Sequence, residues 1–116
     1  GGMTLGADPI LTAASLAALD RGRVLPALIV RKEPKGHGTL KWVEGIENVP
    51  SSAQVLVLED VVTKGGSSLL AAERLRLAGY SPHSVLTVVD REQGGRELLL
   101  QRGLELMSLL SIRDIL

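Results

Sequence analysis

Two adjacent carboxylates, Glu59 and Asp60, stand between an aliphatic run and a glycine-containing turn in VLVLEDVVTKGGSS, residues 55–68. The turn itself, Thr63 to Ser67, lies between an expected strand and an expected helix start. Free backbone N–H groups and the helix dipole favour an anion such as phosphate there. The stretch matches neither the GxxxxGK[ST] phosphate loop nor the dinucleotide GxGxxG pattern.

The two acids would repel a phosphate, so they need another partner. Ionised carboxylates accept hydrogen bonds from hydroxyls and help to hold Mg²⁺. A sugar phosphate, with a phosphate at one end and hydroxyls in its middle, fits both halves of the stretch. Without the glycine turn, the acidic pair could equally be explained as two residues that end a strand and cap a turn.

A second candidate is the basic stretch RKEPKGHGT, residues 31–39, which holds Arg31, Lys32, Lys35 and His37 together with two glycines. Such a loop could cover a leaving group that gains negative charge as it departs. The alternative is a solvated basic turn with an exposed histidine.

Alternating strand and helix signals are expected to position these residues. The aliphatic runs predict strands at 26–31, 55–60, 84–90 and 104–110, and the helical spacing predicts helices from Asp8 to about residue 21, at 67–79 and at 94–103, with a last helical turn after 110. Residues 32–54 are predicted to be a long, mobile surface segment. Strands joined by helices indicate a doubly wound parallel α/β sheet, which binds ligands at the carboxyl ends of its strands.

The composition limits the number of domains, the type of core and the kinds of partner. The 116 residues suffice for one domain, and 45% apolar with 2% aromatic residues predicts an aliphatic core. A net charge of zero gives no field that would attract nucleic acid or an anionic membrane. The absence of cysteine excludes disulfides and thiolate metal sites, and no apolar run reaches the about 20 residues of a membrane span. We therefore expect a cytoplasmic protein.

The stretch VLVLEDVVTKGGSS closely resembles the phosphoribosyl-pyrophosphate motif of the type I phosphoribosyltransferases. The resemblance implies that Glu59 and Asp60 hold the ribose 2- and 3-hydroxyls. It also implies that the amides and hydroxyls of the turn grip the 5-phosphate. The substrate-binding residues are then Glu59, Asp60, Val61, Val62, Thr63, Lys64, Gly65, Gly66 and Ser67. Lys64 departs from the motif, which usually has a small residue there.

The basic stretch resembles the flexible catalytic loop of the orotate phosphoribosyltransferases, in which Arg-Lys-Glu-x-Lys-x-His-Gly is distinctive. In that family the loop crosses a dimer interface. By this resemblance Arg31, Lys35 and His37 would serve the partner subunit's site in a homodimer, while Lys32 would serve its own.

Two further stretches agree with this resemblance. GGMTLGADP, residues 1–9, is similar to the family's pyrophosphate loop, here Thr4, Leu5, Gly6 and Ala7, leading into a helix capped by Asp8. VVDREQGG, residues 88–95, is similar to the segment whose arginine, here Arg91, contacts the orotate carboxylate. Without this context they would be an ordinary turn and a surface ion pair.

The resemblance implies transfer of a 5-phosphoribosyl group from phosphoribosyl pyrophosphate to orotate. It also implies that Mg²⁺ is held mainly through the substrate, with Glu59 or Asp60 as the candidate protein ligand. Residues 1–116 would form one catalytic core domain, with a flexible catalytic loop at about 32–45 and without the family's N-terminal hood. The alternatives are a type I phosphoribosyltransferase for another base, a non-catalytic phosphoribosyl-pyrophosphate-binding regulator, and an inactive fragment.

Overall fold

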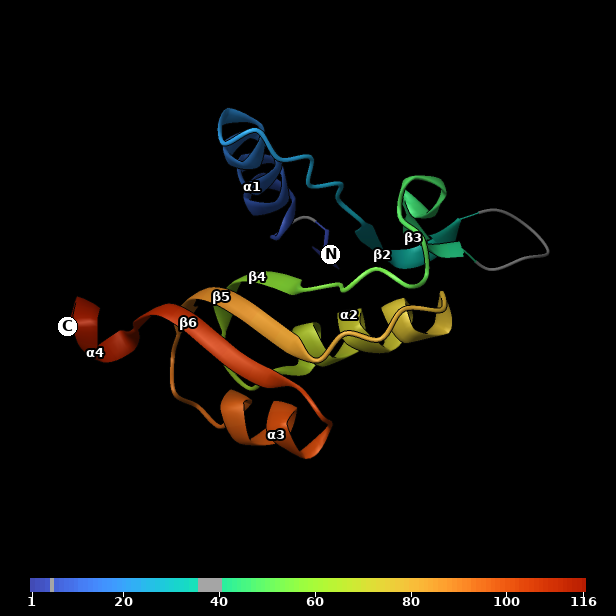
Figure 1. Ribbon diagram of the computed structural model, residues 1–116. Coiled ribbons are helices and arrows are strands. Elements are labelled where there is room, and N and C mark those ends of the chain that lie inside the picture. Colours follow the sequence, from blue (N-terminus) through green and yellow to red (C-terminus); the bar gives the residue numbers. More distant parts are fainter. Residues whose placement is uncertain (5, 36–40) are drawn as a thin grey trace.

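The computed structural model describes residues 1–4, 6–35 and 41–116. Helices and strands alternate along most of the chain (Figure 1). They are β1 (Gly2–Met3), α1 (Asp8–Asp20), β2 (Ile29–Lys35), β3 (Lys41–Glu44), the 3₁₀ turn η1 (Ile46–Asn48), β4 (Val57–Val62), α2 (Gly66–Leu77), β5 (Ser84–Asp90), α3 (Gly95–Gln101), β6 (Glu105–Ser111) and α4 (Ile112–Ile115).

The strands form two three-stranded sheets, β1-β2-β3 and β4-β5-β6. Gly1 joins them, because its carbonyl accepts from the Leu58 N–H at 2.6 Å and its nitrogen donates to the Leu56 carbonyl at 2.7 Å. This is the hydrogen-bond pattern of a parallel pair centred on Val57. The described strands therefore lie in the order β3-β2-β1-β4-β5-β6, and β3 is antiparallel to β2.

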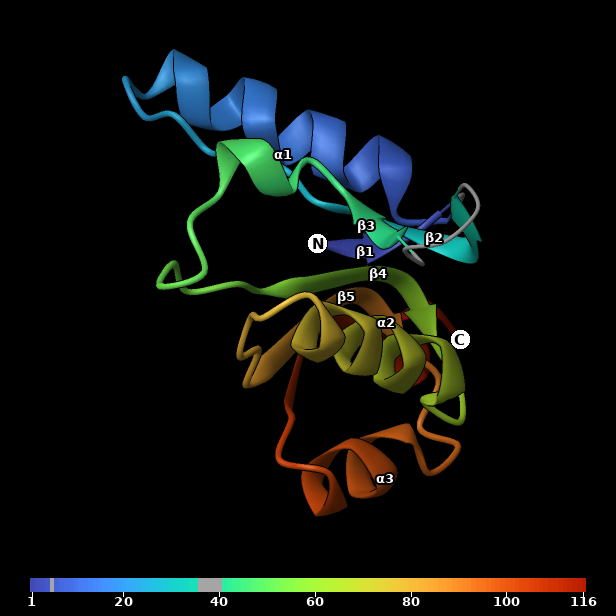
Figure 2. The ribbon, with the colours of Figure 1, turned by 90° about the vertical axis from the view of Figure 1, so that its right-hand side faces the viewer.

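Helices lie on both sides of this layer. Figure 2 shows α1 on one side of the strands and α2 with α3 on the other. The expected doubly wound α/β architecture is confirmed, with an antiparallel strand at one edge. None of the described helices is long and apolar enough to cross a membrane.

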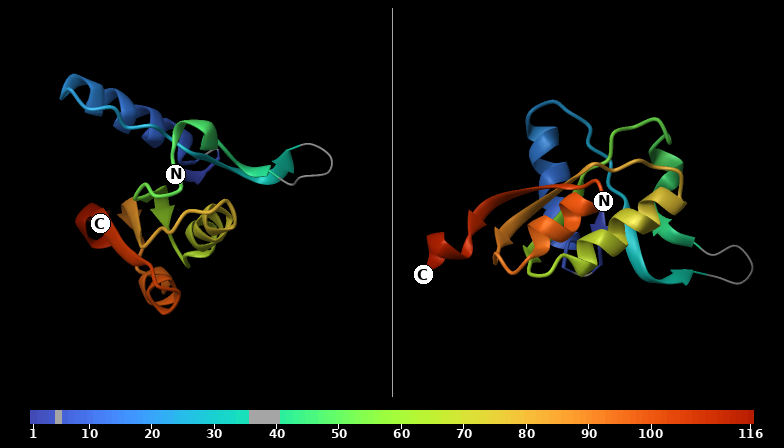
Figure 3. Two further views of the ribbon diagram at one scale, coloured as in Figure 1. Left: turned by 45° about the vertical axis from the view of Figure 1, so that its right-hand side comes forward. Right: turned by 90° about the horizontal axis from the view of Figure 1, so that it is seen from below.

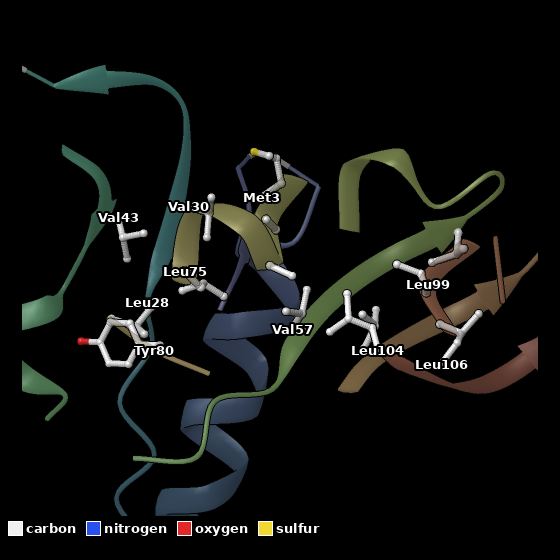
Figure 4. Close-up of a cluster of buried hydrophobic side chains, with 14 of the residues drawn as sticks. Met3, Leu28, Val30, Val43, Val57, Leu75, Tyr80, Leu99, Leu104 and Leu106 are labelled. Carbon is white, nitrogen blue, oxygen red and sulfur yellow. The ribbon is translucent and has the colours of Figure 1, made fainter. Parts of the chain in front are cut away.

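The core is aliphatic, as the composition predicted. Leu75 of α2 and Leu99 of α3 are fully buried, and so are Val57 of β4 and the neighbouring Leu104 (Figure 4). Val85 of β5 is also fully buried. The one tyrosine, Tyr80, is 4% exposed and donates its hydroxyl to the Val49 carbonyl at 2.7 Å. A buried aromatic hydroxyl thus has the partner that burial demands.

The segment predicted to be irregular, residues 32–54, contains regular structure. β2 begins three residues later than expected and runs on to Lys35, and β3 pairs with it as a hairpin that projects from the body (Figure 3). Apolar contact explains this, since Val43 of β3 is 4% exposed within the core. The glycines, prolines and charged residues of the segment favoured an irregular loop, and the sequence does not show that Val43 packs in the core.

Two element ends also differ from expectation. β4 runs to Val62, two residues beyond the predicted end, because Val61 and Val62 continue the parallel pairing with Val89 and Asp90 of β5. Glu59 and Asp60 therefore lie within the strand. The cap of α1 is Ala7, and Asp8 is the first residue of the helix instead of its cap.

Candidate active site

The glycine turn lies at the carboxyl end of β4 and is held by backbone hydrogen bonds. Gly95 N–H donates to the Thr63 carbonyl at 3.1 Å, and Arg91 N–H donates to the Val62 carbonyl at 2.9 Å. Gly65 has φ +89°, a left-handed conformation that glycine adopts without strain. The turn is thus fixed against the connection between β5 and α3.

Close packing makes glycine necessary at Gly95. A β-carbon there would lie 2.5 Å from Val62 Cγ1 and 2.8 Å from the Thr63 carbonyl oxygen. Neither distance is possible without moving the turn. The Gly94–Gly95 pair therefore restricts the conformation of the Gly65–Gly66 pair.

The turn leads directly into α2, whose first residues are Gly66 and Ser67, both exposed. The first amides of a helix lack partners within the helix, so this end can bind a phosphate. Lys64 is also exposed and adds a positive charge beside the turn. The predicted anion site is therefore open to solvent.

The two carboxylates of β4 lie on opposite faces of the sheet, because adjacent residues of a strand alternate. Asp60 is exposed, and its Oδ1 accepts from the Val61 N–H at 2.8 Å. It lies beside the predicted pyrophosphate loop, since a β-carbon at Gly6 would be 3.1 Å from Asp60 Oδ2. Segments more than fifty residues apart in the sequence thus meet at Asp60.

Glu59 is 6% exposed and lies on the α2 side of the sheet. Its Oε2 accepts from Ser68 Oγ at 3.1 Å. Burial and, to a smaller extent, the neighbouring Asp60 raise the pKa of Glu59 to about 7, although the Ser68 hydrogen bond opposes part of the rise. Of the two acids predicted to hold sugar hydroxyls, only Asp60 is presented at the surface, and Glu59 supports the strand from beneath.

A polar hollow of about 420 Å³ brings together residues from both other predicted stretches. Thr4 of the pyrophosphate loop lines it with Arg31 and Lys32 of β2. The remaining lining residues are Asp8, Ile29, Glu33 and Glu44. Arg31 NH1 is paired with Glu44 Oε1 at 3.1 Å across the hairpin.

Asp8 is a further candidate site residue, although the sequence pattern predicted it only as a helix cap. Its Oδ2 accepts from Thr4 Oγ1 at 2.5 Å, while its Oδ1 is buried without a hydrogen-bond partner among the described residues. A buried acceptor without a partner is costly, so a bound donor would be favoured there. The Thr-x-x-x-Asp spacing around Gly6 is the signal that could have identified the pair.

The other predicted residues are placed as follows. Arg91 is exposed directly after β5, next to the turn, and precedes Glu92, which has φ +56°. Val61 is exposed and Val62 is buried. Lys35 ends β2, and Leu5 and His37 lie outside the described residues.

An apolar cavity of about 320 Å³ lies away from these groups. Leu11 of α1, Leu25, Leu28, Val55 and Leu58 are among its lining residues. It contains none of the predicted site residues, so it is separate from the candidate active site.

The donor set fits a magnesium ion that is held mainly by its substrate. No cluster of three or more His, Asp or Glu side chains suited to a metal occurs among the described residues. Mg²⁺ in nucleotide and phosphate enzymes commonly takes one or two protein carboxylates and completes its shell with phosphates and water. The exposed carboxylate of Asp60 is of that kind.

The fold and this site define a class: the chain has the type I phosphoribosyltransferase fold, with an acid pair followed by a glycine turn at the carboxyl end of a central strand. Within this class the chain is similar to proteins named orotate phosphoribosyltransferase. The enzyme of that name from Nostoc sp. is 51% identical over 114 residues, which are 98% of this chain and 55% of the relative.

Solved structures agree with the sequence match. The Mycobacterium tuberculosis orotate phosphoribosyltransferase in complex with Fe(III) dicitrate has a TM-score of 0.86 and 40% identity, over 99% of this chain and 63% of that chain. The same enzyme in complex with phosphoribosyl pyrophosphate has a TM-score of 0.82 and 37% identity, with the same coverage. No protein-family model matches the chain. The chain spans little more than half the length of the curated relatives it matches, from 55% to 62%.

Proposed function

We propose that this chain carries the core of an orotate phosphoribosyltransferase, which transfers a 5-phosphoribosyl group from phosphoribosyl pyrophosphate to N1 of orotate. The products are orotidine 5-phosphate and pyrophosphate. The observation that carries the proposal is the meeting of Asp60, the glycine turn and the Gly6 loop at one edge of the sheet. A related structure with phosphoribosyl pyrophosphate bound supports the choice of donor substrate.

The turn would hold the 5-phosphate through the backbone N–H groups and hydroxyls of Thr63 to Ser67. Asp60 would accept hydrogen bonds from the ribose hydroxyls. Glu59, buried beneath it, would fix the strand that carries Asp60 instead of touching the sugar directly. These contacts hold the ribose C1 in one place for attack by orotate.

No nucleophilic side chain is needed in this mechanism. Positive charge develops on the ribose ring as the C1–oxygen bond to pyrophosphate breaks, and N1 of orotate attacks the opposite face. Negative charge then grows on the pyrophosphate, which Arg31, Lys32, Lys35 and His37 would neutralise. Asp60 would serve as a protein ligand for Mg²⁺, which would supply further neutralisation of the pyrophosphate charge.

Base recognition would involve Arg91, whose guanidinium is suited to the orotate carboxylate. Its position directly after β5 and beside the turn supports this role. The loop at about 32–45 would cross to a second subunit in a cytoplasmic homodimer, with Arg31, Lys35 and His37 completing the partner subunit's site and Lys32 its own.

Orotate-dependent release of pyrophosphate from phosphoribosyl pyrophosphate, in the presence of Mg²⁺, tests the proposal. The expected result is formation of orotidine 5-phosphate, with adenine, guanine and uracil as inactive controls. Faster reaction with one of these bases would show a phosphoribosyltransferase of different specificity. Binding of phosphoribosyl pyrophosphate without turnover of any base would contradict catalysis by this chain.

A further inference from the structure

One side chain of α2 contacts all three strands of the first sheet. The guanidinium of Arg74 lies 4.0 Å from the centre of the Trp42 ring in β3, and its NH1 donates to the Arg31 carbonyl of β2 at 2.5 Å. The same nitrogen lies 3.7 Å from Met3 Sδ in β1. Arg74 is partly buried between the helix and these strands.

These contacts fall where the hairpin is least regular. β2 and β3 pair regularly at Ile29 with Glu44 and at Val30 with Val43, and the register shifts before the next pair, Lys35 with Lys41. Arg31 and Trp42 are the first residues beyond the regular pairs. Arg74 thus attaches the hairpin to α2 at the point where the regular strand pairing is interrupted.

Helix α2 connects this attachment point with the glycine turn. α2 begins at Gly66, within the glycine turn of residues 63–67, which is called the phosphate turn below. Arg74 follows eight residues later, about 12 Å along the helix axis. A continuous helix is stiff over that length. The position of the turn and the position of Arg31 are therefore coupled through one rigid element.

We propose that Arg74 is a positioning residue for the reaction, which fixes the base of the β2–β3 hairpin, and with it Arg31 and Lys32, relative to the phosphate turn. This inference rests on the proposed function. Arginine suits the task because its planar guanidinium can stack on an indole and donate a hydrogen bond in its plane at the same time. A lysine offers a point charge and could make one of these contacts well, but not both.

The chain offers a matched control in Arg76 on the same helix. Its NH2 donates to the carbonyls of Pro82, at 3.4 Å, and Arg102, at 3.2 Å, so its partners lie away from the hairpin. Arg74→Met and Arg76→Met each remove one positive charge from α2 and keep a side chain of similar length. Arg74→Lys is the conservative variant.

The experiment combines steady-state kinetics with amide hydrogen exchange of the full chain. For Arg74→Met we expect kcat to fall about tenfold or more while KM for phosphoribosyl pyrophosphate changes less than about threefold, because positioning is lost and the phosphate turn is intact. Exchange of the amides in residues 29–35 should speed up, while exchange in α3 stays as in the wild type. Arg74→Lys should recover part of kcat, and Arg76→Met should behave as the wild type in both measurements.

Several results would overturn the inference. They are a kcat of Arg74→Met within about twofold of the wild type, unchanged exchange in residues 29–35, or an equal loss in Arg76→Met. A loss of kcat matched by a lower calorimetric stoichiometry for phosphoribosyl pyrophosphate would indicate partial unfolding and would also reject a positioning role. If the wild-type chain lacked transferase activity altogether, the proposed function would fail, and the exchange comparison would still decide whether Arg74 fixes the hairpin.

Discussion

At the scale of single residues, strand geometry assigns different environments to two chemically similar neighbours. Glu59 and Asp60 are adjacent in β4, so they face opposite sides of the sheet. Asp60 is exposed beside Gly6, and Glu59 is buried against Ser68. One motif thus contains an exposed carboxylate and a buried one.

The pKa of Glu59 makes the stability of the protein depend on pH. Below about pH 4.5 the carboxyl is protonated in both the folded and the unfolded chain. Between there and about pH 7 only the unfolded chain ionises, so the free energy of unfolding falls as pH rises. The cost of ionising Glu59 in the folded state is fully present above about pH 7 and amounts to at most about 3 kcal/mol.

We therefore expect Glu59→Gln to gain stability relative to the wild type as pH rises. The amide oxygen can still accept from Ser68, but no charge is buried. Urea unfolding of both proteins at about pH 4.5 and about pH 8 measures the difference, which should be larger at the higher pH by about 1–3 kcal/mol. A difference independent of pH would show that Glu59 ionises without a burial cost.

Asp60→Asn should weaken the binding of phosphoribosyl pyrophosphate. The neutral amide keeps the shape but accepts weaker hydrogen bonds from hydroxyls and is a poorer ligand for Mg²⁺, so we expect about a tenfold rise in Kd. Calorimetry with Mg²⁺ measures it, and Asp20→Asn at the exposed end of α1 serves as a control. Equal affinity of Asp60→Asn and the wild type would remove Asp60 from the sugar site.

At the scale of elements, the conformation of the glycine turn, residues 63–67, depends on the elements that pack against it. Gly65 takes the left-handed conformation, and the Gly94–Gly95 turn packs against it through the hydrogen bond from Gly95 to Thr63. The local sequence predicted both helix starts within one residue. The contact between the two turns depends on how β4 and β5 pair, and local sequence contains no direct signal for it.

A substitution at Gly95 tests this contact. Gly95→Ala should lower the free energy of unfolding by about 2–3 kcal/mol, because the new methyl group would overlap Val62 and Thr63. Gly66→Ala is the matched control, since its β-carbon meets nothing within 4 Å. It should change stability by less than about 1 kcal/mol. Thermal or urea unfolding measures both, and equal effects would mean that the two turns are not in tight contact.

At the scale of the whole molecule, the sequence predicts structure best where one residue type has one physical use. Aliphatic runs predicted β4, β5 and β6, which the structure confirms. That the acid pair and the glycine turn bind a ligand at the carboxyl end of β4 stays a prediction. Prediction from the sequence failed where long-range contacts decide. Val43 makes β3 part of the core, and the burial of Glu59 beside Ser68 depends on how α2 packs on β4; the local sequence indicates neither contact.

The proposed homodimer makes a prediction at this scale. If Lys35 completes the partner's site while Asp60 serves its own subunit, then mixing Lys35→Ala with Asp60→Asn restores one complete site in each mixed dimer. At a one-to-one ratio with free exchange, about a quarter of wild-type activity should return. Activity equal to the sum of the separate variants would mean that each site is built within one subunit.

The central claim is that one ribose phosphate binds at Asp60 and the glycine turn. Calorimetric titration of the wild-type chain with phosphoribosyl pyrophosphate and Mg²⁺, followed by displacement with ribose 5-phosphate, tests it most directly. We predict saturable binding at one site per chain, which ribose 5-phosphate displaces and 2-deoxyribose 5-phosphate displaces less well. The absence of saturable binding, or equal displacement by the two sugars, would contradict it.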